Sequence, residues 1–364
     1  MRIGILGCYG HGNIGDEAIL ASLIKYLKTH APSIDIIVFS DDPYDTFNIH
    51  KINAISSNIK KNFYQIFNTL KNIDMLIIGG GGLIHDYRSN VIPYYLFWCL
   101  IAKLLRKPVY LCSVGVGPLN TWTGKKLAYL LAYFSNRISV RDEESFSLLL
   151  RTGIRKDILV SSDLAILLPL YSDVTTEKNI VIPEPSIGIS LREWFQFEDR
   201  ISFCQNTSAM VDQLINRLGL YIGFIIMCKN QDLSLALKIK NLCRNKEKVW
   251  IIDKYSNPTE MLTVLKNMEL IIGMRLHSLI MGASVGVPIL GLEYDIKVRN
   301  FLQSLELEEY CCRIEDLYSG RLIEKIIDLW DKRNLIKNHI KINISNLQKR
   351  TLYSNDEIFL GKIS

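Results

Sequence analysis

The chain has 364 residues, of which 48% are hydrophobic and 22% charged, as expected of a globular protein with a proper core. This length is comfortable for two domains. The formal net charge of +6 is mild, and no block of Lys and Arg is interleaved with aromatic residues, so no nucleic acid partner is expected. The charge suits an anionic substrate or loose peripheral contact with an anionic membrane surface.

The N-terminus begins directly with a strand-like run at residues 1–6, so we expect no signal peptide and a cytoplasmic protein. The most apolar segment, residues 94–105, is too short to span a bilayer and is interpreted as a buried helix. The eight cysteines lack metal-ligand spacing and are interpreted as small buried hydrophobes in a reducing compartment. Neither a metal ion nor a cofactor is expected.

Strand and helix patterns alternate from the start of the chain, which predicts a doubly wound, mostly parallel sheet in a first domain, residues 1–170. The predicted strands are 3–6, 35–40, 74–78, 109–112, 137–140 and 158–160, and the predicted helices are 16–27, 63–70, 94–105, 125–134 and 143–150.

A proline-containing polar stretch, residues 171–185, is the predicted linker. A second α/β series follows in residues 186–320, with strands at 187–191, 221–227, 249–252 and 270–272 and a further short apolar run at 288–292. Two amphipathic helices in residues 321–364 close the chain. The predicted fold class is therefore α/β, with two Rossmann-like domains facing each other across a cleft and additional C-terminal helices.

The segment 273–300 carries the strongest functional signal. Arg275 and His277 lie at a strand-to-helix turn, which is where ligands bind in open α/β sheets. Because a helix N-terminus offers free N–H groups and a positive dipole end, an added Arg and His favour an anion such as phosphate or carboxylate. Lys297 follows the next apolar run and can reach the same cleft.

Three glycine turns follow strands of the first domain. Residues 10–15 match the dinucleotide pattern Gly-x-Gly-x-x-Gly, but the loop is long, and Asp16 and Glu17 would repel a pyrophosphate. The alternatives are a close backbone turn, or a site in which Asn13, Asp16 and Glu17 hydrogen-bond a polyhydroxylated ligand. The other two turns are 79–82, which precedes Asp86, and 115–118; they either approach a ligand or let two loops pass.

These motifs resemble the polysaccharide pyruvyltransferases, in particular the bacterial cell-surface type that ketalises N-acetylmannosamine in cell-wall polymers. The resemblance runs in order from about residue 1 to about residue 305. It is carried by residues 7–20, 79–86, 115–118, 139–145 and 162–165 and by the Arg-Leu-His block. It implies a GT-B-like pair of domains, with phosphoenolpyruvate as the donor and a pyruvate ketal on a sugar as the product. A departure from the family pattern lies at residues 228–231.

The resemblance implies His277 as the catalytic residue. The implied donor-binding residues are Arg192, Arg275, Leu276, Lys297 and Arg141, and the implied acceptor-binding residues are Gly12, Asn13, Asp16, Glu17 and Asp86. Arg is well matched to phosphoenolpyruvate because its planar fork binds two oxygens at once. A histidine with a pKa near neutrality can deliver or remove the protons that ketal formation requires.

The expected acceptor is a lipid-linked glycan precursor at the cytoplasmic face of a membrane. Two other functions compete with this interpretation. One is a GT-B glycosyltransferase that uses a nucleotide sugar, for which Glu293 is the nearby acid suited to a donor ribose. The other is an NAD- or glycan-binding module built on residues 10–15. No sequence feature determines the oligomeric state.

Overall fold

The computed structural model describes residues 1–174, 182–193 and 200–363, with side chains up to residue 359. The chain forms two compact units. Unit 1 holds Met1–His11, Asp16–Tyr171 and Leu347–Ser364, and unit 2 holds Gly12–Gly15 and Ser172–Asn346. The division between Tyr171 and Ser172 lies next to the expected boundary at 170. It also assigns residues 12–15 to unit 2 and divides the expected C-terminal segment 321–364 at residue 347. Residues 175–181, inside the expected linker, lie outside the described residues.

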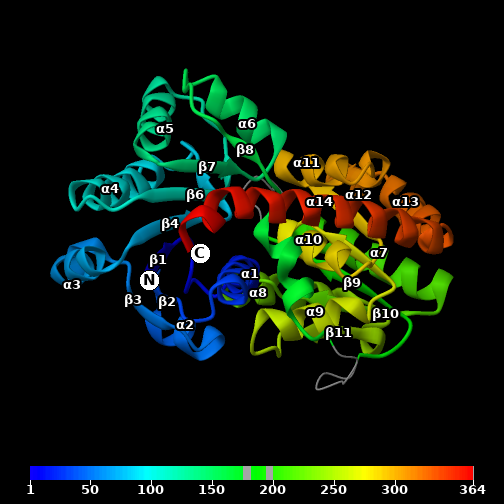
Figure 1. The fold of residues 1–364 in the computed structure, drawn as a ribbon. Helices are drawn as coiled ribbons and strands as arrows, with labels where there is room; N and C mark the ends of the chain where they lie inside the picture. Colours follow the sequence, from blue (N-terminus) through cyan, green and yellow to red (C-terminus); the bar gives the residue numbers. More distant parts are fainter. Residues whose placement is uncertain (175–181, 194–199, 364) are drawn as a thin grey trace. The chain divides into compact units, whose positions relative to one another are not determined.

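Unit 1 is built on a parallel sheet with the strand order β3-β2-β1-β4-β6-β7-β8, and β5 pairs with β6 (Figure 1). Its strands are β1 (Arg2–Leu6), β2 (Asp35–Ser40), β3 (Asn53–Ser56), β4 (Met75–Gly79), β5 (Gly82–Ile84), β6 (Val109–Val116), β7 (Arg137–Val140) and β8 (Leu159–Val160). Its other elements are α1 (Ile14–His30), α2 (Pro43–His50), α3 (Ile59–Asn72), α4 (Val91–Leu104), α5 (Trp122–Phe134), α6 (Glu143–Leu150), the 3-10 helix η1 (Leu164–Tyr171) and the end of α14 (Arg333–Ile363).

The strand order determines which helices share a face of this sheet. From β1 to β3 the chain moves in one direction along the sheet, and from β3 to β8 it moves in the other. Since crossovers between parallel strands are right-handed, α1 and α2 cover one face, and α3 to α6 cover the opposite face. The end of α14 joins the first group, because the Phe359 ring lies 6.0 Å from Tyr26 of α1 and 6.3 Å from Tyr110 of β6.

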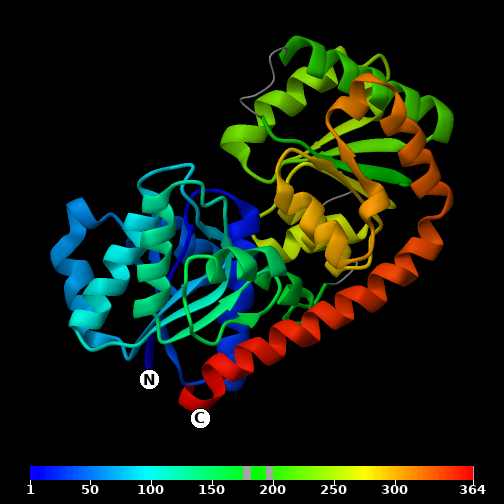
Figure 2. The same cartoon turned by 90° about the horizontal axis from the view of Figure 1, so that it is seen from above.

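Unit 2 has a second sheet, which is drawn in green to orange in Figure 2. This sheet is parallel, with the order β11-β10-β9-β12-β13-β14. Its strands are β9 (Ser186–Ser190), β10 (Tyr221–Ile225), β11 (Val249–Ile252), β12 (Leu270–Gly273), β13 (Ile289–Glu293) and β14 (Cys311–Arg313). Its helices are α7 (Arg200–Leu218), α8 (Lys229–Leu242), α9 (Pro258–Lys266), α10 (Leu276–Ser284), α11 (Ile296–Ser304), α12 (Glu315–Tyr318), α13 (Arg321–Asp331) and the start of α14, with short 3-10 helices η2 (Lys246–Lys248) and η3 (Glu308–Tyr310).

Local sequence explains why these elements start where they do. Asn257 caps α9, accepting from the backbone N–H groups of Thr259 and Glu260, and Pro258 occupies the first helical position. Asp295 caps α11 in the same way, through the N–H of Lys297. All four residues of β12 are buried, which is why this strand is a continuous apolar run rather than an alternating pattern.

The predicted α/β class and the two parallel sheets are confirmed. The short segments α2 and β3 were not predicted, because residues 43–56 lack an apolar period. The last predicted helix is the longer α14, whose first part belongs to unit 2 and whose end belongs to unit 1.

The interpretation of residues 94–105 as a buried helix was only half right. One face of α4 is buried in the core of unit 1, but Phe97, Leu100 and Leu104 are exposed. Within the described part of the chain, no helix is both long and apolar enough to cross a membrane.

Candidate active site

The strand order of unit 2 creates a switch point between β9 and β12. From β9 the chain proceeds to β10 and β11 on one side, and β12, β13 and β14 extend the sheet on the other. Ligands of open parallel sheets bind beyond the carboxyl ends of the strands at such a point. Ser190 and Gly273, the last residues of β9 and β12, are register partners, and the N–H of Met274 donates to the Ser190 carbonyl at 2.8 Å. Arg192 and Arg275 each follow two residues later, so the fold brings these two predicted donor-site residues to adjacent strand ends.

Arg275 is the N-cap residue of α10, and its side chain turns to α8 instead of capping the helix. Its Nη2 donates to Gln231 Oε1 at 2.8 Å and forms a short ion pair with Asp232. The side chain of Arg275 is 10% exposed and that of Asp232 2%. Asp232 also accepts from the Cys228 N–H at 2.9 Å, which ties it to the start of its own helix.

Burial raises the pKa of the Asp232 carboxyl, while the neighbouring Arg275 and, from further away, Arg192 act in the opposite direction. Arg192 and Arg275 follow neighbouring parallel strands, so both arginines lie at the same edge of the sheet. Breaking a buried ion pair leaves an uncompensated charge and typically costs about 3–5 kcal/mol. The guanidinium of Arg275 is therefore held firmly in place.

Tyr294 connects two more of the predicted cations. Arg192 Nη1 donates to Tyr294 Oη at 3.2 Å, and the guanidinium carbon of Arg192 lies 5.4 Å from the centre of the ring. Lys297 Nζ lies 5.2 Å from the same ring and 3.2 Å from Asp295 Oδ2. A cation over a Tyr face is attracted by the negative face of the ring. The cluster thus contains Arg192, Lys297 and Arg275 around the ends of β9, β12 and β13.

Residues 12–15, from the N-terminal glycine loop, belong to unit 2, whereas the residues that flank them in the sequence belong to unit 1. Asn13 forms an isolated antiparallel bridge with Cys228, and the N–H of Ile14 donates to the Met227 carbonyl at 3.0 Å. The predicted acceptor-side residues Gly12 and Asn13 therefore share a unit with the predicted donor residues.

Gly15 lies directly against the catalytic candidate His277. A Cβ on Gly15 would come within 2.3 Å of His277 Cγ and Nδ1, a distance that real Cβ atoms do not adopt. His277 is half-buried in the first turn of α10, next to the buried Leu276. The absence of a side chain at position 15 is thus the local condition for the His277 ring to occupy its place.

The predicted donor residue Arg141 lies in unit 1. Its Nε donates to Asp142 Oδ2 at 3.2 Å, and its Nη1 lies 3.7 Å from the buried Asp163. Asp86 of the same unit accepts from the Thr121 N–H at 2.6 Å and from its hydroxyl at 2.8 Å. Burial acts to raise the pKa of Asp86, but the hydrogen bonds from the Thr121 turn outweigh it, and the net shift is downward.

The two carboxylates at the start of α1 differ in their surroundings. Glu17 is buried, accepting from the Gly10 N–H at 2.9 Å and pairing with His50 Nε2 at 2.7 Å. Asp16 is half-buried and lies beside Gly81, in the predicted second glycine turn. Of the two, Asp16 is the more accessible to an acceptor. The Gly10 N–H, which a bound pyrophosphate would need, is already used by Glu17.

The second and third glycine turns pass close to one another. The Gly115 N–H donates to the Gly81 carbonyl at 2.7 Å, and a Cβ on Gly115 would lie 3.1 Å from the Gly82 Cα. Of the two explanations for these glycines, the passing of two loops is therefore observed directly.

Asp232, Gln231 and Tyr294 were not predicted as site residues. A signal was present, because residues 231–232 lie four and five positions after the apolar run 221–227, and Tyr294 lies two positions after the run 288–292. Glu293, the acid considered for a nucleotide ribose, is bound by Arg299, whose Nε lies 3.2 Å from Glu293 Oε2. No group of three or more potential metal ligands is found among the described residues.

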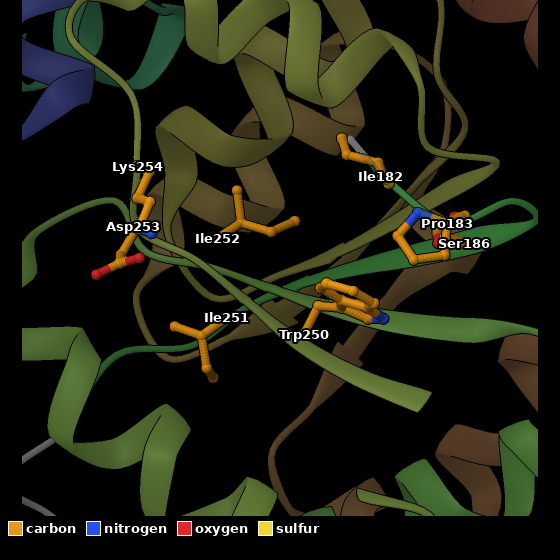
Figure 3. Close-up of a pocket in the computed structure, with 9 residues that line it drawn as sticks. Ile182, Pro183, Ser186, Trp250, Ile251, Ile252, Asp253 and Lys254 are labelled. Atoms are coloured by element: carbon orange, nitrogen blue, oxygen red, sulfur yellow. Dashed lines mark hydrogen bonds between the residues drawn. The ribbon is translucent and has the colours of Figure 1, made fainter. Parts of the chain in front are cut away.

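A cavity of about 210 Å³ in unit 2 holds none of the predicted site residues. Figure 3 shows its lining, which is mostly apolar and comes from β11 and from the chain before and within β9 and β10. The predicted cluster is therefore not this cavity. Its lining residues are Ile182, Pro183, Ser186, Gly223, Trp250, Ile251, Ile252, Asp253 and Lys254.

The comparisons with known proteins decide the family. A family model described as polysaccharide pyruvyl transferase matches residues 13–296, most of the chain. The chain belongs to the polysaccharide pyruvyl transferase family. A member of this family is an enzyme that transfers a pyruvyl group to a polysaccharide, so the transferase interpretation is favoured over the binding module. The chain is also 22% identical to the amylovoran biosynthesis protein AmsJ of Erwinia amylovora, covering 93% of this chain and 94% of that protein.

Solved structures with a similar fold include several UDP-N-acetylglucosamine 2-epimerases, which confirms the GT-B-like fold. The S. aureus MnaA–UDP structure has a TM-score of 0.67 and 13% identity, covering 98% of this chain and 95% of that one. The epimerase of Rickettsia bellii has a TM-score of 0.65 and 11% identity, covering 100% and 97%. At this identity the likeness concerns the fold alone.

We predict that Gly15→Ala impairs pyruvyl transfer by displacing His277. Overpacking of this kind costs about 1–3 kcal/mol, and the ring can relieve it only by moving. Turnover should fall at least about tenfold, while the variant remains folded in a thermal melt. The matched control is Gly219→Ala, which carries backbone strain (φ +68°) but has no neighbour within 4 Å of its Cβ. Equal turnover in the two variants would show that Gly15 does not position His277.

We predict that Tyr294→Phe weakens donor binding less than Tyr294→Leu. The Phe variant loses the hydrogen bond from Arg192, worth about 0.5–1.5 kcal/mol, but keeps the ring beneath the two cations. The Leu variant loses both contacts. Donor KM should therefore rise up to about tenfold for Phe and further for Leu. If both variants keep the wild-type KM, Tyr294 has no part in the donor site.

Proposed function

We propose that the enzyme takes its pyruvyl group from phosphoenolpyruvate. The single observation that carries this proposal is the position of Arg192 and Arg275 at adjacent strand ends of the switch point, with Lys297 joined to Arg192 through Tyr294. Phosphoenolpyruvate bears a phosphate and a carboxylate, and arginine forks bind both groups with paired hydrogen bonds. The first turn of α10 adds backbone N–H groups and a positive dipole end.

The proposed reaction joins two sugar hydroxyls to C2 of phosphoenolpyruvate. Two C–O bonds form at C2, the C–O bond to the phosphate breaks, and the methylene carbon becomes a methyl group. Of the two hydroxyl protons, one ends on the methyl group and the other on the released phosphate. His277, at the start of α10, is the proposed general acid for the methylene carbon. Asp16, which is the more exposed of the two carboxylates of α1, is the proposed acceptor base.

The proposed acceptor is an amino sugar of a cell-wall or exopolysaccharide precursor, with N-acetylmannosamine as the first candidate and a lipid carrier as its anchor. The match to a polysaccharide family and to AmsJ, a biosynthesis protein of the polysaccharide amylovoran, supports a glycan acceptor. The proposed location is the cytoplasmic face of a membrane, where lipid-linked precursors are assembled.

We predict that substitution of the arginines weakens donor binding, whereas substitution of His277 slows proton transfer. With phosphoenolpyruvate and amino-sugar acceptors, the wild type should release phosphate and add a pyruvyl mass to the glycan. Arg192→Ala and Arg275→Lys should raise donor KM, the latter because Lys keeps the charge but loses the fork. His277→Gln should lower kcat by about 10²-fold or more with donor KM nearly unchanged, the usual scale for losing a general acid.

Thermal-shift measurements distinguish the competing donors. Phosphoenolpyruvate should stabilise the protein, whereas UDP-sugars and NAD should not. Stabilisation by a UDP-sugar alone, with no phosphate release from phosphoenolpyruvate on any acceptor, would overturn the proposal in favour of a glycosyltransferase. A normal donor KM in Arg275→Lys would make Arg275 a structural residue, held by Asp232.

A further inference from the structure

The helices α3, α4 and α5 form a continuous layer on one face of the unit 1 sheet. They connect strands in the same direction along the sheet, so the right-handed crossovers place them on the same side. α4 packs against both α3 and α5, and the three helices lie next to one another in Figures 1 and 2. We call the outward surface of these three helices the outer helix face.

The outer helix face carries an apolar stripe on α4. Pro93, Phe97, Leu100 and Leu104 are exposed, and their spacing of four, three and four residues places them along one side of the helix. Leu104 is 78% exposed, Leu100 41% and Phe97 39%. The opposite side of α4 is in the core, where Trp98 is fully buried. Because a helix that is apolar all round normally has partners all round, this stripe indicates a surface that is covered in use.

The two flanking helices add exposed aromatic rings. Tyr64 on α3 and Trp122 on α5 are 80% and 72% exposed. Phe63 on α3 and Tyr133 on α5 are about half exposed, and Lys126 Nζ lies 4.9 Å from the Trp122 ring. Trp and Tyr have an apolar body and a polar edge, so they are favoured where hydrocarbon meets water.

The charge of the outer helix face is of one sign. The sequences of α3, α4 and α5 contain six lysines and no Asp or Glu. Six positive charges equal the formal net charge of the whole chain, +6, so the remainder of the chain is neutral on balance. Near an anionic bilayer each such lysine contributes about 1 kcal/mol of attraction. The lysines are Lys60, Lys61, Lys71, Lys103, Lys125 and Lys126.

We propose that the outer helix face docks on the surface of an anionic lipid bilayer. Basic side chains interleaved with Trp, Tyr, Phe and Leu are the composition by which helices bind in the plane of a membrane interface. A second copy of the chain is the less suitable occupant, because two such faces would bring only lysines together without a single acidic partner. A bilayer accommodates the apolar stripe and the lysines at once.

The outer helix face lies next to a residue that is predicted to bind the acceptor. Asp86, a predicted acceptor-binding residue, accepts from the N–H and hydroxyl of Thr121, the N-cap of α5, and Trp122 is the next residue. The same loop leads into α4, since the Val91 N–H donates to the Arg88 carbonyl. Docking would therefore bring the Asp86 loop to the membrane surface, where a lipid-linked glycan is held. This last step rests on the proposed function, whereas the docking itself does not.

The test is flotation of the full-length protein with vesicles of phosphatidylcholine containing phosphatidylglycerol, compared with vesicles of phosphatidylcholine alone. The wild type should bind the anionic vesicles, and added salt should weaken binding. The apolar variant Phe97→Ser/Leu104→Ser and the charge variant Lys125→Glu/Lys126→Glu should each lose about tenfold or more in partitioning. Neither pair belongs to the proposed active site, so phosphate release with a water-soluble acceptor should be unchanged.

Matched controls lie on α14, within unit 2. Leu335→Ser/Ile342→Ser removes two apolar side chains that are 69% and 64% exposed, and Lys337→Glu/Lys341→Glu reverses two exposed charges. Both controls should bind vesicles like the wild type. Equal binding to neutral vesicles, loss of binding in the controls, or no binding at all would overturn the proposal. So would light scattering that shows a dimer which the outer-face variants dissociate. Vesicle binding requires no catalysis, so its outcome is independent of the identity of the donor.

Discussion

The buried ion pair between Arg275 and Asp232 is the interaction on which the arrangement of the candidate site depends. It holds the first residue before α10 against the first turn of α8, and so links the ends of β12 and β10 across β9. Both partners are nearly inaccessible to water, so separating them would leave a buried charge without a partner. This fixes the helix start that carries His277 and leaves Arg192 and Lys297, joined through Tyr294, as the more accessible cations.

A second constraint comes from the far N-terminus of the chain. Residues 12–15 form part of unit 2, where Asn13 bridges to Cys228 and Gly15 contacts the His277 ring. The neighbouring residues 10 and 17 are held together in unit 1 through the Glu17 carboxylate, which also pairs with His50. The glycine loop therefore connects the two units and supports the catalytic candidate, which explains its glycines without a dinucleotide.

Much of the fold could be predicted because parallel strands covered on both faces are continuous apolar runs. The bounds of β2, β7, α6 and β11 agree with the prediction residue for residue. The short elements α2 and β3 could not be predicted, since they are set by a cap at Asp42 and by pairing with β2 and not by an apolar period. The exposure of one side of α4 could not be predicted either, because periodicity does not show which side of an apolar helix is covered.

In the candidate site, too, residues with a local sequence signal could be predicted, whereas contacts between distant residues could not. Arg275, His277 and Lys297 were predictable because they follow strand-like runs within a distinctive block. The partnership of Arg275 with Asp232 was not, since a contact between residues 43 positions apart leaves no local signal. Nor could the sequence show that Gly15 lies on His277, or that Glu17 is buried while Asp16 is accessible.

The central claim is that the cations at the ends of β9, β12 and β13 form the donor site. The most direct measurement is a crystal structure of the protein with phosphoenolpyruvate. The account predicts the phosphate and carboxylate against Arg192, Arg275, Lys297 and the first turn of α10, with the methylene carbon next to His277. Phosphoenolpyruvate bound elsewhere, with these side chains in contact only with one another, would contradict it.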